Sequence, residues 1–423
     1  MEDKIEKIAK KIYEQGGKIY LVGGAIRDEI LRREIHDKDY CVVGISSDKF
    51  QEIFPEARKQ GKMFEVFCID NTQFAMARKE TKKGTGHKGF EIETGENISI
   101  EEDLKRRDIT INSIAKDVLT GEIIDPFDGI KDIQNRIIKA TSEAFKEDPL
   151  RVYRVARFSS ELDFDVEDRT IEMMESLKSE LNSLSEERVF VEFKKALVSN
   201  KPSNFFQVLR KANILDVHFK EIYDLIDSIQ PEKYHPEGDS YNHTMIVVDK
   251  SVELTEKLEI RFACLVHDLG KGITPREMMP HHYGHDAKGV RLVENFCRRL
   301  KIPNSWLKCG KVSAKEHMRG GMFNKMTIPK QIDFITNVDK SLLGLDGMEI
   351  VVMCDKFRDN KLPEDIVFSK IGKECLKQIN GKYIKEKYDI SEANYTKFKE
   401  LLKKERIEWL KIEKNVENIN LLV

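Results

Sequence analysis

The sequence predicts an α+β fold, with a mixed α/β head of roughly 140 residues followed by an almost entirely helical remainder. The head is indicated by short β-rich runs that alternate with glycine turns and helical stretches, namely Lys18–Val22, Tyr40–Val43 and Phe64–Ile69. From Glu147 onward the apolar residues recur at three- and four-residue steps, which is the spacing of a helix with one buried face. Strand-like alternation almost vanishes there, so we expect only helical regions after the head.

Length and composition restrict the class of protein. The 423 residues leave room for about two to four domains. Hydrophobic residues make up 40% and charged residues 35%, which excludes collagen and low-complexity disorder. The net charge of −2 gives no overall attraction to a polyanion, so a nucleic acid would need a local basic face. The 7 cysteines never form a C-x-x-C pair, so we expect reduced thiols rather than disulfides or a zinc knuckle.

The sequence contains no apolar run of about 18 residues and no secretory leader, which predicts a cytoplasmic protein without a membrane partner. Two segments with turn-forming residues, Gln230–Ser240 and Asp359–Pro363, are expected to be linkers. The Lys-rich stretch Lys377–Lys414 predicts one or two helices, with either a solvated or an RNA-contacting face. The expected domains are residues 1–140, 141–229, 230–360 and 361–423.

The first candidate site begins where an apolar strand meets two glycines. Lys18–Val22 runs into Gly23 and Gly24, and the following residues have helical spacing. This junction allows backbone N–H groups to face a phosphate, and Arg27 adds positive charge one turn into the helix.

A pair of carboxylates follows about ten residues later. Asp37 and Asp39 open the strand Tyr40–Val43, and strand alternation would place both on one face. An isolated pair of this kind is usually a solvated turn. After a phosphate-type turn, however, two hard oxygen ligands suit Mg²⁺, and phosphoryl transfer needs a metal beside the triphosphate.

The segment Gly84–Gly89 formally matches G-x-G-x-x-G, the pattern of a dinucleotide-binding turn. It does not open a helix, because the following Phe90–Glu93 alternates like a strand. We therefore expect a flexible basic loop.

Arginines gather in two later segments. Arg106 and Arg107 precede a helix-like stretch. A helix is predicted after Glu147, with Asp148 at the N-cap and Pro149 at the first helical position. The three-residue spacing of Arg151, Arg154 and Arg157 forms a drifting stripe on this helix, either acid-paired and solvated or available to a ligand.

Histidines are concentrated in the second half of the chain, where seven of the ten lie between His235 and His317. His267 and Asp268 directly follow an apolar run. Imidazoles combined with carboxylates suit a divalent transition metal. For any single histidine, hydrogen bonding to the backbone inside a core is the alternative.

Four ordered motifs together resemble those of class II CCA-adding tRNA nucleotidyltransferases. They are Leu21–Asp28, Asp37–Asp39, Arg106–Asn112 and Glu147–Arg151. The similarity extends from about Lys18 to about Asp359 and is strongest to the bacterial multifunctional form, which carries an HD phosphohydrolase domain. It implies a polymerase-β-like head with a mixed sheet, a helical neck for nucleotide selection and RNA binding, an HD domain and a helical tail.

The resemblance also implies roles for individual residues. Asp37 and Asp39 would be catalytic and hold Mg²⁺. Glu80 is a candidate third carboxylate. The nucleotide would be bound by Gly24, Arg27, Arg107, Asp148, Arg151, Arg154 and Arg157.

In this family the aspartate and first arginine of the fourth motif, here Asp148 and Arg151, choose the base without a nucleic-acid template. A carboxylate accepts from the exocyclic amine of cytosine or adenine, while a guanidinium donates to the adjacent ring nitrogen. Uracil and guanine place a carbonyl against the carboxylate. An unpaired buried polar group costs about 1–3 kcal/mol, which is enough for discrimination.

For the HD domain the resemblance implies the metal ligands His243, His267, Asp268 and Asp355. Asp359 is the alternative to Asp355. The metal would be a transition metal such as Ni²⁺, Co²⁺ or Mn²⁺. His285 and His317 are candidates for a second metal, and His281 and His282 for contacts with a substrate phosphate.

We therefore expect an enzyme that adds and repairs the 3′-terminal CCA of tRNA from CTP and ATP. A second activity would be that of a 2′,3′-cyclic phosphodiesterase, 2′-nucleotidase or phosphatase. The alternatives are a poly(A) polymerase, an enzyme adding only C or only A, and an inert RNA-binding protein. Intact Asp37, Asp39 and Arg107 argue against an inert protein. Besides tRNA and the two nucleotides, we expect no membrane partner and a monomer or weak homodimer.

Overall fold

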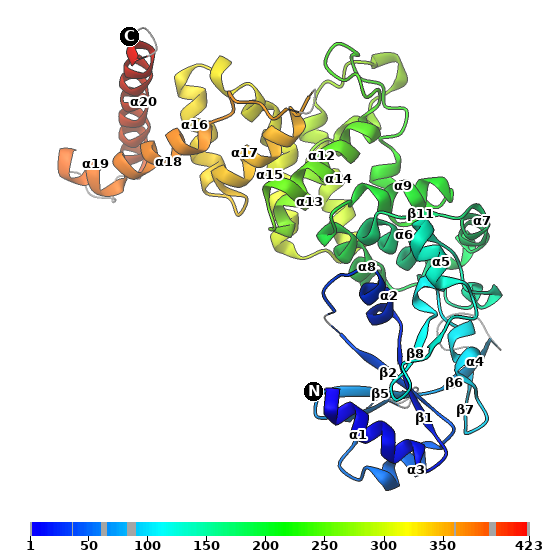
Figure 1. The fold of residues 1–423 in the computed structure, drawn as a ribbon. Helices are drawn as coiled ribbons and strands as arrows, with labels where there is room; N and C mark the ends of the chain where they lie inside the picture. Colours follow the sequence, from blue (N-terminus) through cyan, green and yellow to red (C-terminus); the bar gives the residue numbers. More distant parts are fainter. Residues whose placement is uncertain are drawn as a thin grey trace. The chain divides into compact units, whose positions relative to one another are not determined.

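The computed structural model describes residues 2–35, 37–60, 66–82, 90–358, 361–388 and 395–420. The chain forms two compact units (Figure 1). The first unit comprises residues 1–196 and 204–217, and the second comprises residues 197–203 and 218–423.

The first unit is built around a seven-stranded mixed sheet with the order β3-β4-β5-β2-β1-β8-β9. Strands β2 and β5 pair in parallel, and the other neighbours are antiparallel. This arrangement confirms the predicted mixed sheet. The strands are β1 (Lys18–Val22), β2 (Asp39–Val43), β3 (Arg58–Gln60), β4 (Val66–Ile69), β5 (Thr72–Met76), β8 (Ala115–Asp117) and β9 (Ile123–Ile124).

Apolar side chains cover both faces of this sheet because the central strands alternate in burial. On one face, helices α1 (Glu2–Tyr13) and α3 (Ser47–Ile53) contribute Ile12 and Phe50 to a core, and the rings of Phe50 and Phe67 stack at 4.7 Å. On the other face, Leu104 of α4 (Ile100–Lys105) packs near β1 and β2. The sheet therefore holds the start of β2 in a fixed place.

A separate hairpin joins β6 (Arg78–Lys82) and β7 (Phe90–Thr94). Its second strand confirms that the expected G-x-G-x-x-G segment is not followed by a helix. Residues 83–89, which contain all of that motif, lie outside the described residues, as does the side chain of Glu80.

Short helices complete the first unit and lead toward the second. They are α2 (Gly24–Ile30), α5 (Gly129–Asn135), α6 (Leu150–Leu162), α7 (Asp168–Ser176), α8 (Glu186–Val198), α9 (Ser203–Lys211) and α10 (Leu215–His218). A two-residue parallel pair, β10 (Ile137–Ile138) with β11 (Asp165–Val166), interrupts the helices, so the remainder is helical with this small exception.

The described part of the second unit is helical, as predicted. Its helices are α11 (Lys220–Tyr223), α12 (Ser240–Leu254), α13 (Leu258–Val266), α14 (His285–Arg299), α15 (Asn304–Gly321), α16 (Ile328–Asp339), α17 (Gly344–Asp355), α18 (Phe368–Gln378), α19 (Gly381–Tyr388) and α20 (Tyr395–Asn420). The Lys-rich stretch thus forms α19 and α20, and Leu410 of α20 joins the core of this unit. None of the described helices has both the length and the apolar character needed to cross a membrane.

Candidate functional site: an arginine-lined cavity and a histidine–aspartate cluster

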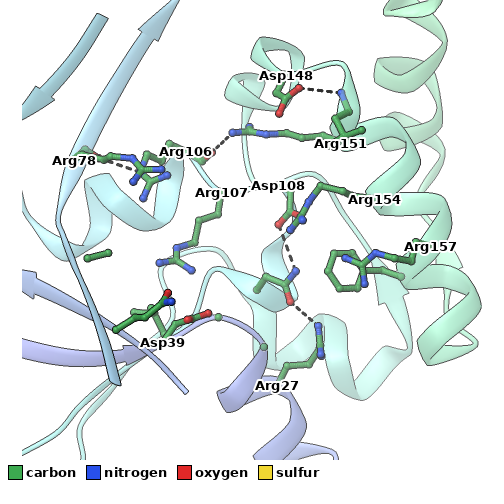
Figure 2. A pocket seen from close by; sticks show the side chains of 18 of the residues that line it. Arg27, Asp39, Arg78, Arg106, Arg107, Asp108, Asp148, Arg151, Arg154 and Arg157 are labelled. Atoms are coloured by element: carbon green, nitrogen blue, oxygen red, sulfur yellow. Dashed lines mark hydrogen bonds and ion pairs between the residues drawn. The ribbon is translucent and has the colours of Figure 1, made fainter. Parts of the chain in front are cut away.

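A cavity of about 590 Å³ opens in the first unit (Figure 2). Basic side chains outnumber acidic ones in its lining, which suits a polyanionic ligand such as a triphosphate. The basic residues are Arg27, Arg78, Arg106, Arg107, Arg151, Arg154, Arg157 and Arg188, and the acidic ones are Asp39, Asp108, Asp148 and Glu161.

The predicted strand–glycine–helix junction forms one part of the cavity. Strand β1 ends at Val22 and α2 begins at Gly24. Gly23 has a φ of 77°, in the left-handed region that glycine adopts without a steric penalty. A Cβ atom there would come within 3.2 Å of the Arg107 guanidinium. A glycine at this position thus allows the turn and Arg107 to lie side by side.

The two predicted catalytic carboxylates lie differently from one another. Asp39 is the first residue of β2 and lines the cavity, whereas Asp37 precedes the strand. Both side chains are exposed. The strand begins only at Asp39, so its alternation does not include Asp37, and the shared face of the two carboxylates stays a prediction. The hard oxygens of both carboxylates remain suitable ligands for Mg²⁺.

A chain of hydrogen bonds connects α2 to α6. Arg27 binds its neighbour Asp28 through Nε at 3.0 Å and donates through NH1 to Asn112 Oδ1 at 2.8 Å. The Asn112 amide donates to Asp108 Oδ1 at 3.4 Å, and Arg154 Nε donates to Asp108 Oδ2 at 2.7 Å. Burial acts to raise the pKa of Asp108, but Arg154 and further partners outweigh burial and lower this pKa to about 2.

A buried carboxylate also fixes Arg106 and Arg107. Asp103, on α4, is 1% exposed and accepts from Arg106 Nε at 3.0 Å and from Arg107 NH2 at 3.1 Å. Asp103 was not among the site residues predicted from the sequence. Asp103 lies three residues before Arg106 and four before Arg107. Residues at these spacings meet on the surface of a helix, so the sequence did contain a sign of the two ion pairs.

Asp148 lies at the opposite side of the cavity from Asp39 (Figure 2). Its carboxylate accepts from the backbone N–H of Leu150 at 3.0 Å and from Arg188 NH2 at 3.1 Å. Helix α6 begins at Leu150 with Pro149 as its N-cap residue, one position later than expected. Asp148 still accepts a hydrogen bond from the first turn of α6, although it lies one residue before the N-cap. Arg188, on α8, was not found from the sequence because its partner lies 40 residues earlier.

The other arginines of α6 are also engaged. Arg151 donates to the carbonyl of Ala144 at 2.7 Å and to that of Arg106 at 2.6 Å. Arg157 pairs with Glu192 at 2.6 Å and with Glu161 at 2.7 Å. The acid-paired interpretation therefore applies to Arg154 and Arg157 in this conformation, although all three line the cavity.

The second unit gathers the predicted metal ligands into one cluster. Ligand atoms of His243, His267, Asp268 and Asp355 lie within 4.8 Å of one another. Asp355 Oδ1 is 3.1 Å from His243 Nε2 and 3.7 Å from His267 Nε2. His267 Nε2 is also 3.1 Å from Asp268 Oδ2. His243 of α12, Asp355 of α17 and the two residues of the turn that follows α13 thus converge although the sequence separates them widely.

Ring orientation in this cluster suits a metal. Nδ1 of His267 faces the Cys264 carbonyl at 2.7 Å, so the hydrogen bond leaves Nε2 directed at the cluster. This buried Nε2 atom forms no hydrogen bond within the described part of the chain. Burial acts to lower the pKa of His267, but Asp268 and Asp355 outweigh burial and raise it to about 10. The carboxylates thus favour a cation at this point, which a bound metal would supply.

Two further histidines face the other oxygen of Asp268. His285 Nε2 is 3.4 Å and His317 Nε2 is 3.3 Å from Asp268 Oδ1. These three residues form a second set of candidate ligands. His282 is engaged through both ring nitrogens, with Thr274 and with the Ile229 carbonyl, each at 2.9 Å. The expected contact of His282 with a substrate phosphate would have to replace one of these bonds.

His281 stacks on Tyr283, with the ring centroids 5.7 Å apart. Asp359, the alternative ligand, lies outside the described residues.

Family models match three successive segments of the chain. They are the Poly A polymerase head domain over residues 19–139, the probable RNA and SrmB-binding site of polymerase A over 163–225, and the HD domain over 240–339. Among solved structures, the Thermotoga maritima CCA-adding enzyme complexed with tRNA has a TM-score of 0.66 at 17% identity, over 96% of this chain and 90% of that one. A CCA-adding enzyme in complex with ATP has a TM-score of 0.65 at 17% identity, over 99% and 94%. These structures share the fold.

Curated relatives are much more similar in sequence. A Multifunctional CCA protein of Psychromonas ingrahamii is 41% identical over 384 residues, which is 89% of this chain and 88% of that protein. A second, from Pseudoalteromonas atlantica, is 46% identical over 294 residues, or 68% of this chain and 72% of that protein. With a polymerase head followed by an HD domain and this identity over most of its length, the chain belongs to the multifunctional CCA protein family, the HD-containing tRNA nucleotidyltransferases.

Proposed function

We propose that this enzyme adds and repairs the 3′-terminal CCA of tRNA, using CTP and ATP without a nucleic-acid template. The observation that carries this proposal is the single cavity that places Asp39, the Gly23–Gly24 turn and Asp148 together among arginines. A carboxylate for a metal, positive charge for a triphosphate and a carboxylate for a base edge are the parts that templateless nucleotide addition requires.

In the proposed reaction the 3′-oxygen of the RNA attacks the α-phosphorus of the nucleotide, and the bond to pyrophosphate breaks. Asp37 and Asp39 would hold Mg²⁺, which neutralises the charge that develops on the transferred phosphoryl group. Arg27 and Arg107 would neutralise the triphosphate from the glycine turn. Their buried or partly buried partners, Asn112 and Asp103, keep both guanidinium groups oriented before substrate arrives.

Asp148 and Arg151 are our candidates for base selection. The Arg188 ion pair holds the Asp148 carboxylate in place, and two backbone carbonyls hold Arg151. Two groups fixed in this way favour bases that offer an amine beside a ring nitrogen. A base without that pattern would leave the carboxylate or the guanidinium without a partner on the base.

The HD domain would carry a separate metal-dependent phosphohydrolase site. His243, His267, Asp268 and Asp355 would hold a transition metal, which lowers the pKa of bound water and polarises a phosphoryl oxygen. Imidazole ligands favour Ni²⁺, Co²⁺ or Mn²⁺ over Ca²⁺. Asp268, His285 and His317 would offer a second position. Substrates would be 2′,3′-cyclic or 2′-phosphate esters.

Incubation of purified protein with Mg²⁺ and tRNA lacking its 3′ end, with each nucleotide singly and together, tests the first activity. Two additions from CTP alone and completion with ATP are expected. A long tail from ATP alone would identify a poly(A) polymerase, and addition of only C or only A a partial enzyme. No addition would identify an inert RNA-binding protein. A cytoplasmic location and a monomer or weak homodimer complete the proposal.

A further inference from the structure

The loop before α12 places a carboxylate next to His243, one member of the histidine–aspartate cluster. Glu237 lies within Gln230–Ser240, the segment expected to be a linker. This segment is tied to the unit at both ends, and at its start Gln230 Oε1 accepts from Lys271 Nζ at 2.6 Å. Asp239 caps α12 by accepting from the Asn242 N–H at 2.8 Å, and Ser240 Oγ donates to the Ser228 carbonyl at 3.0 Å. The Glu237 backbone is thus held beside the first turn of the helix that carries His243.

The Glu237 side chain binds His243 on the side away from the cluster. Its Oε1 lies 2.7 Å from His243 Nδ1, and the side chain of Glu237 is 10% exposed while that of His243 is 1% exposed. An ionised carboxylate can only accept a hydrogen bond. His243 Nδ1 therefore carries the proton, and Nε2 is directed at Asp355, 3.1 Å away.

His243 differs in this respect from the three other rings that face the cluster. Nδ1 of His267, His285 and His317 lies near backbone carbonyls, at 2.7 Å for His267 and His285 and 3.0 Å for His317. Those three orientations are set by the main chain. The orientation of His243 is set by a side chain, which a substitution can remove.

An imidazole and a guanidinium flank the Glu237 carboxylate on its other sides. His235 Nδ1 lies 3.0 Å from the same Oε1 atom, and Arg358 NH2 lies 4.0 Å from it. Arg358 also donates to the carbonyl of Asp355 at 2.9 Å. Glu237 Oε1 therefore contacts three parts of the unit. These are His235 in the same loop, His243 on α12 and Arg358 in the segment after α17.

We propose that Glu237 is a positioning residue for the metal site, acting through the His243 ring. The proposal rests on the proposed metal-dependent activity of the HD domain. Loss of a carboxylate that supports a metal-bound histidine typically weakens metal affinity or activity by about 10- to 100-fold. A different arrangement, with Glu237 itself a ligand beside His235 and His243, is geometrically defined as well. We favour positioning because His243 Nε2 already faces Asp355 and His267.

The test uses the full chain and Co²⁺ as the probe, followed by calorimetry and by the visible absorption of the bound ion. For Glu237→Ala, we expect the Co²⁺ dissociation constant to rise by about 10- to 100-fold with unchanged stoichiometry. Glu237→Gln should restore most of the affinity, since its amide oxygen accepts the same bond. Glu253→Ala, which removes an exposed carboxylate from α12, the helix that carries His243, is the matched control and should bind as the wild type does.

Each result has a distinct meaning. If the wild type binds no Co²⁺, the proposed metal site itself fails. If the wild type binds and Glu237→Ala binds equally well with an unchanged spectrum, only the role of Glu237 is overturned. Loss of one whole equivalent of Co²⁺, with the remaining affinity unchanged, would make Glu237 a ligand and also overturn positioning. Circular dichroism verifies that each variant is folded, and CCA addition, which is assigned to the first unit, verifies that the substitution leaves that unit intact.

Discussion

Arg188 NH2 lies 3.1 Å from Asp148 Oδ2 and joins α8 to a residue two positions before the start of α6. The ion pair holds one of the two proposed base-reading groups. Arg188→Ala should therefore relax base choice by about tenfold, the equivalent of about 1.4 kcal/mol, without abolishing addition. The measurement is the ratio of CTP and ATP incorporation to UTP and GTP incorporation. Equal ratios for mutant and wild type would remove Arg188 from base selection.

The proposed reading groups themselves can be tested in the same assay. Asp148→Ala or Arg151→Ala should reduce discrimination more than it reduces triphosphate affinity, since Arg27 and Arg107 lie elsewhere in the cavity. The expected loss of discrimination is about 10- to 100-fold, from one or two unpaired polar contacts. If the ratio is unchanged in both variants, Asp148 serves only the start of α6.

Asp37→Ala or Asp39→Ala should abolish nucleotide addition while leaving tRNA binding nearly intact. The two carboxylates would hold the metal that neutralises the phosphoryl group, whereas affinity for RNA depends on phosphate contacts made by basic residues. Addition on a gel and tRNA binding by filter retention give the two readouts. Asp48→Ala, an exposed carboxylate at the start of α3, serves as the control. Near-normal addition by either active-site variant would contradict the assignment.

The HD domain should be separable from the polymerase head. Joint substitution of His267 and Asp268 by Ala is expected to end hydrolysis of 2′,3′-cyclic or 2′-phosphate esters and to spare CCA addition. Wild-type hydrolysis should be supported by Ni²⁺, Co²⁺ or Mn²⁺ better than by Ca²⁺. Absence of hydrolysis in the wild type with all of these metals would leave the cluster without the proposed activity.

Acid should weaken the first unit in part through Asp108. Its pKa is about 2 in the folded protein against 3.8 ordinarily, so the ionised form is stabilised by folding. This contribution, about 2 kcal/mol, is present above pH 4 and is lost as the pH falls toward 2. Asp108→Asn should therefore lower stability at pH 7 more than at pH 2.5. Urea unfolding of both proteins at the two pH values measures the difference, and an equal loss at both would contradict it.

Patterns among neighbouring residues in the sequence predicted most of the fold and many of the residues that line the cavity. Strand β1, the glycine turn and the first turn of α6 depend on neighbouring residues, so their patterns are visible in the sequence. The grouping of His243, His267, Asp268 and Asp355 was predicted only from the family resemblance, because it depends on how α12, α13 and α17 pack.

Supporting residues were harder to find for a physical reason. Arg188 and Glu192 meet their partners, Asp148 and Arg157, across 40 and 35 residues, and no local pattern fixes such a distance. Glu237 lies in a segment whose proline and glycine content indicated a linker. The exact start of β2 also could not be predicted, because strand propensity does not distinguish Asp37 from Asp39.

The hydrogen bonds from His267, His285 and His317 to backbone carbonyls affect which substitutions this domain can tolerate. Every amino acid carries the same carbonyl, so replacing Cys264, His282 or Ser313 can preserve these three ring orientations if the helices keep their course. The orientation of His243 depends instead on the Glu237 side chain, so under the proposed role a single substitution at position 237 would weaken the metal site while all four proposed ligands remain.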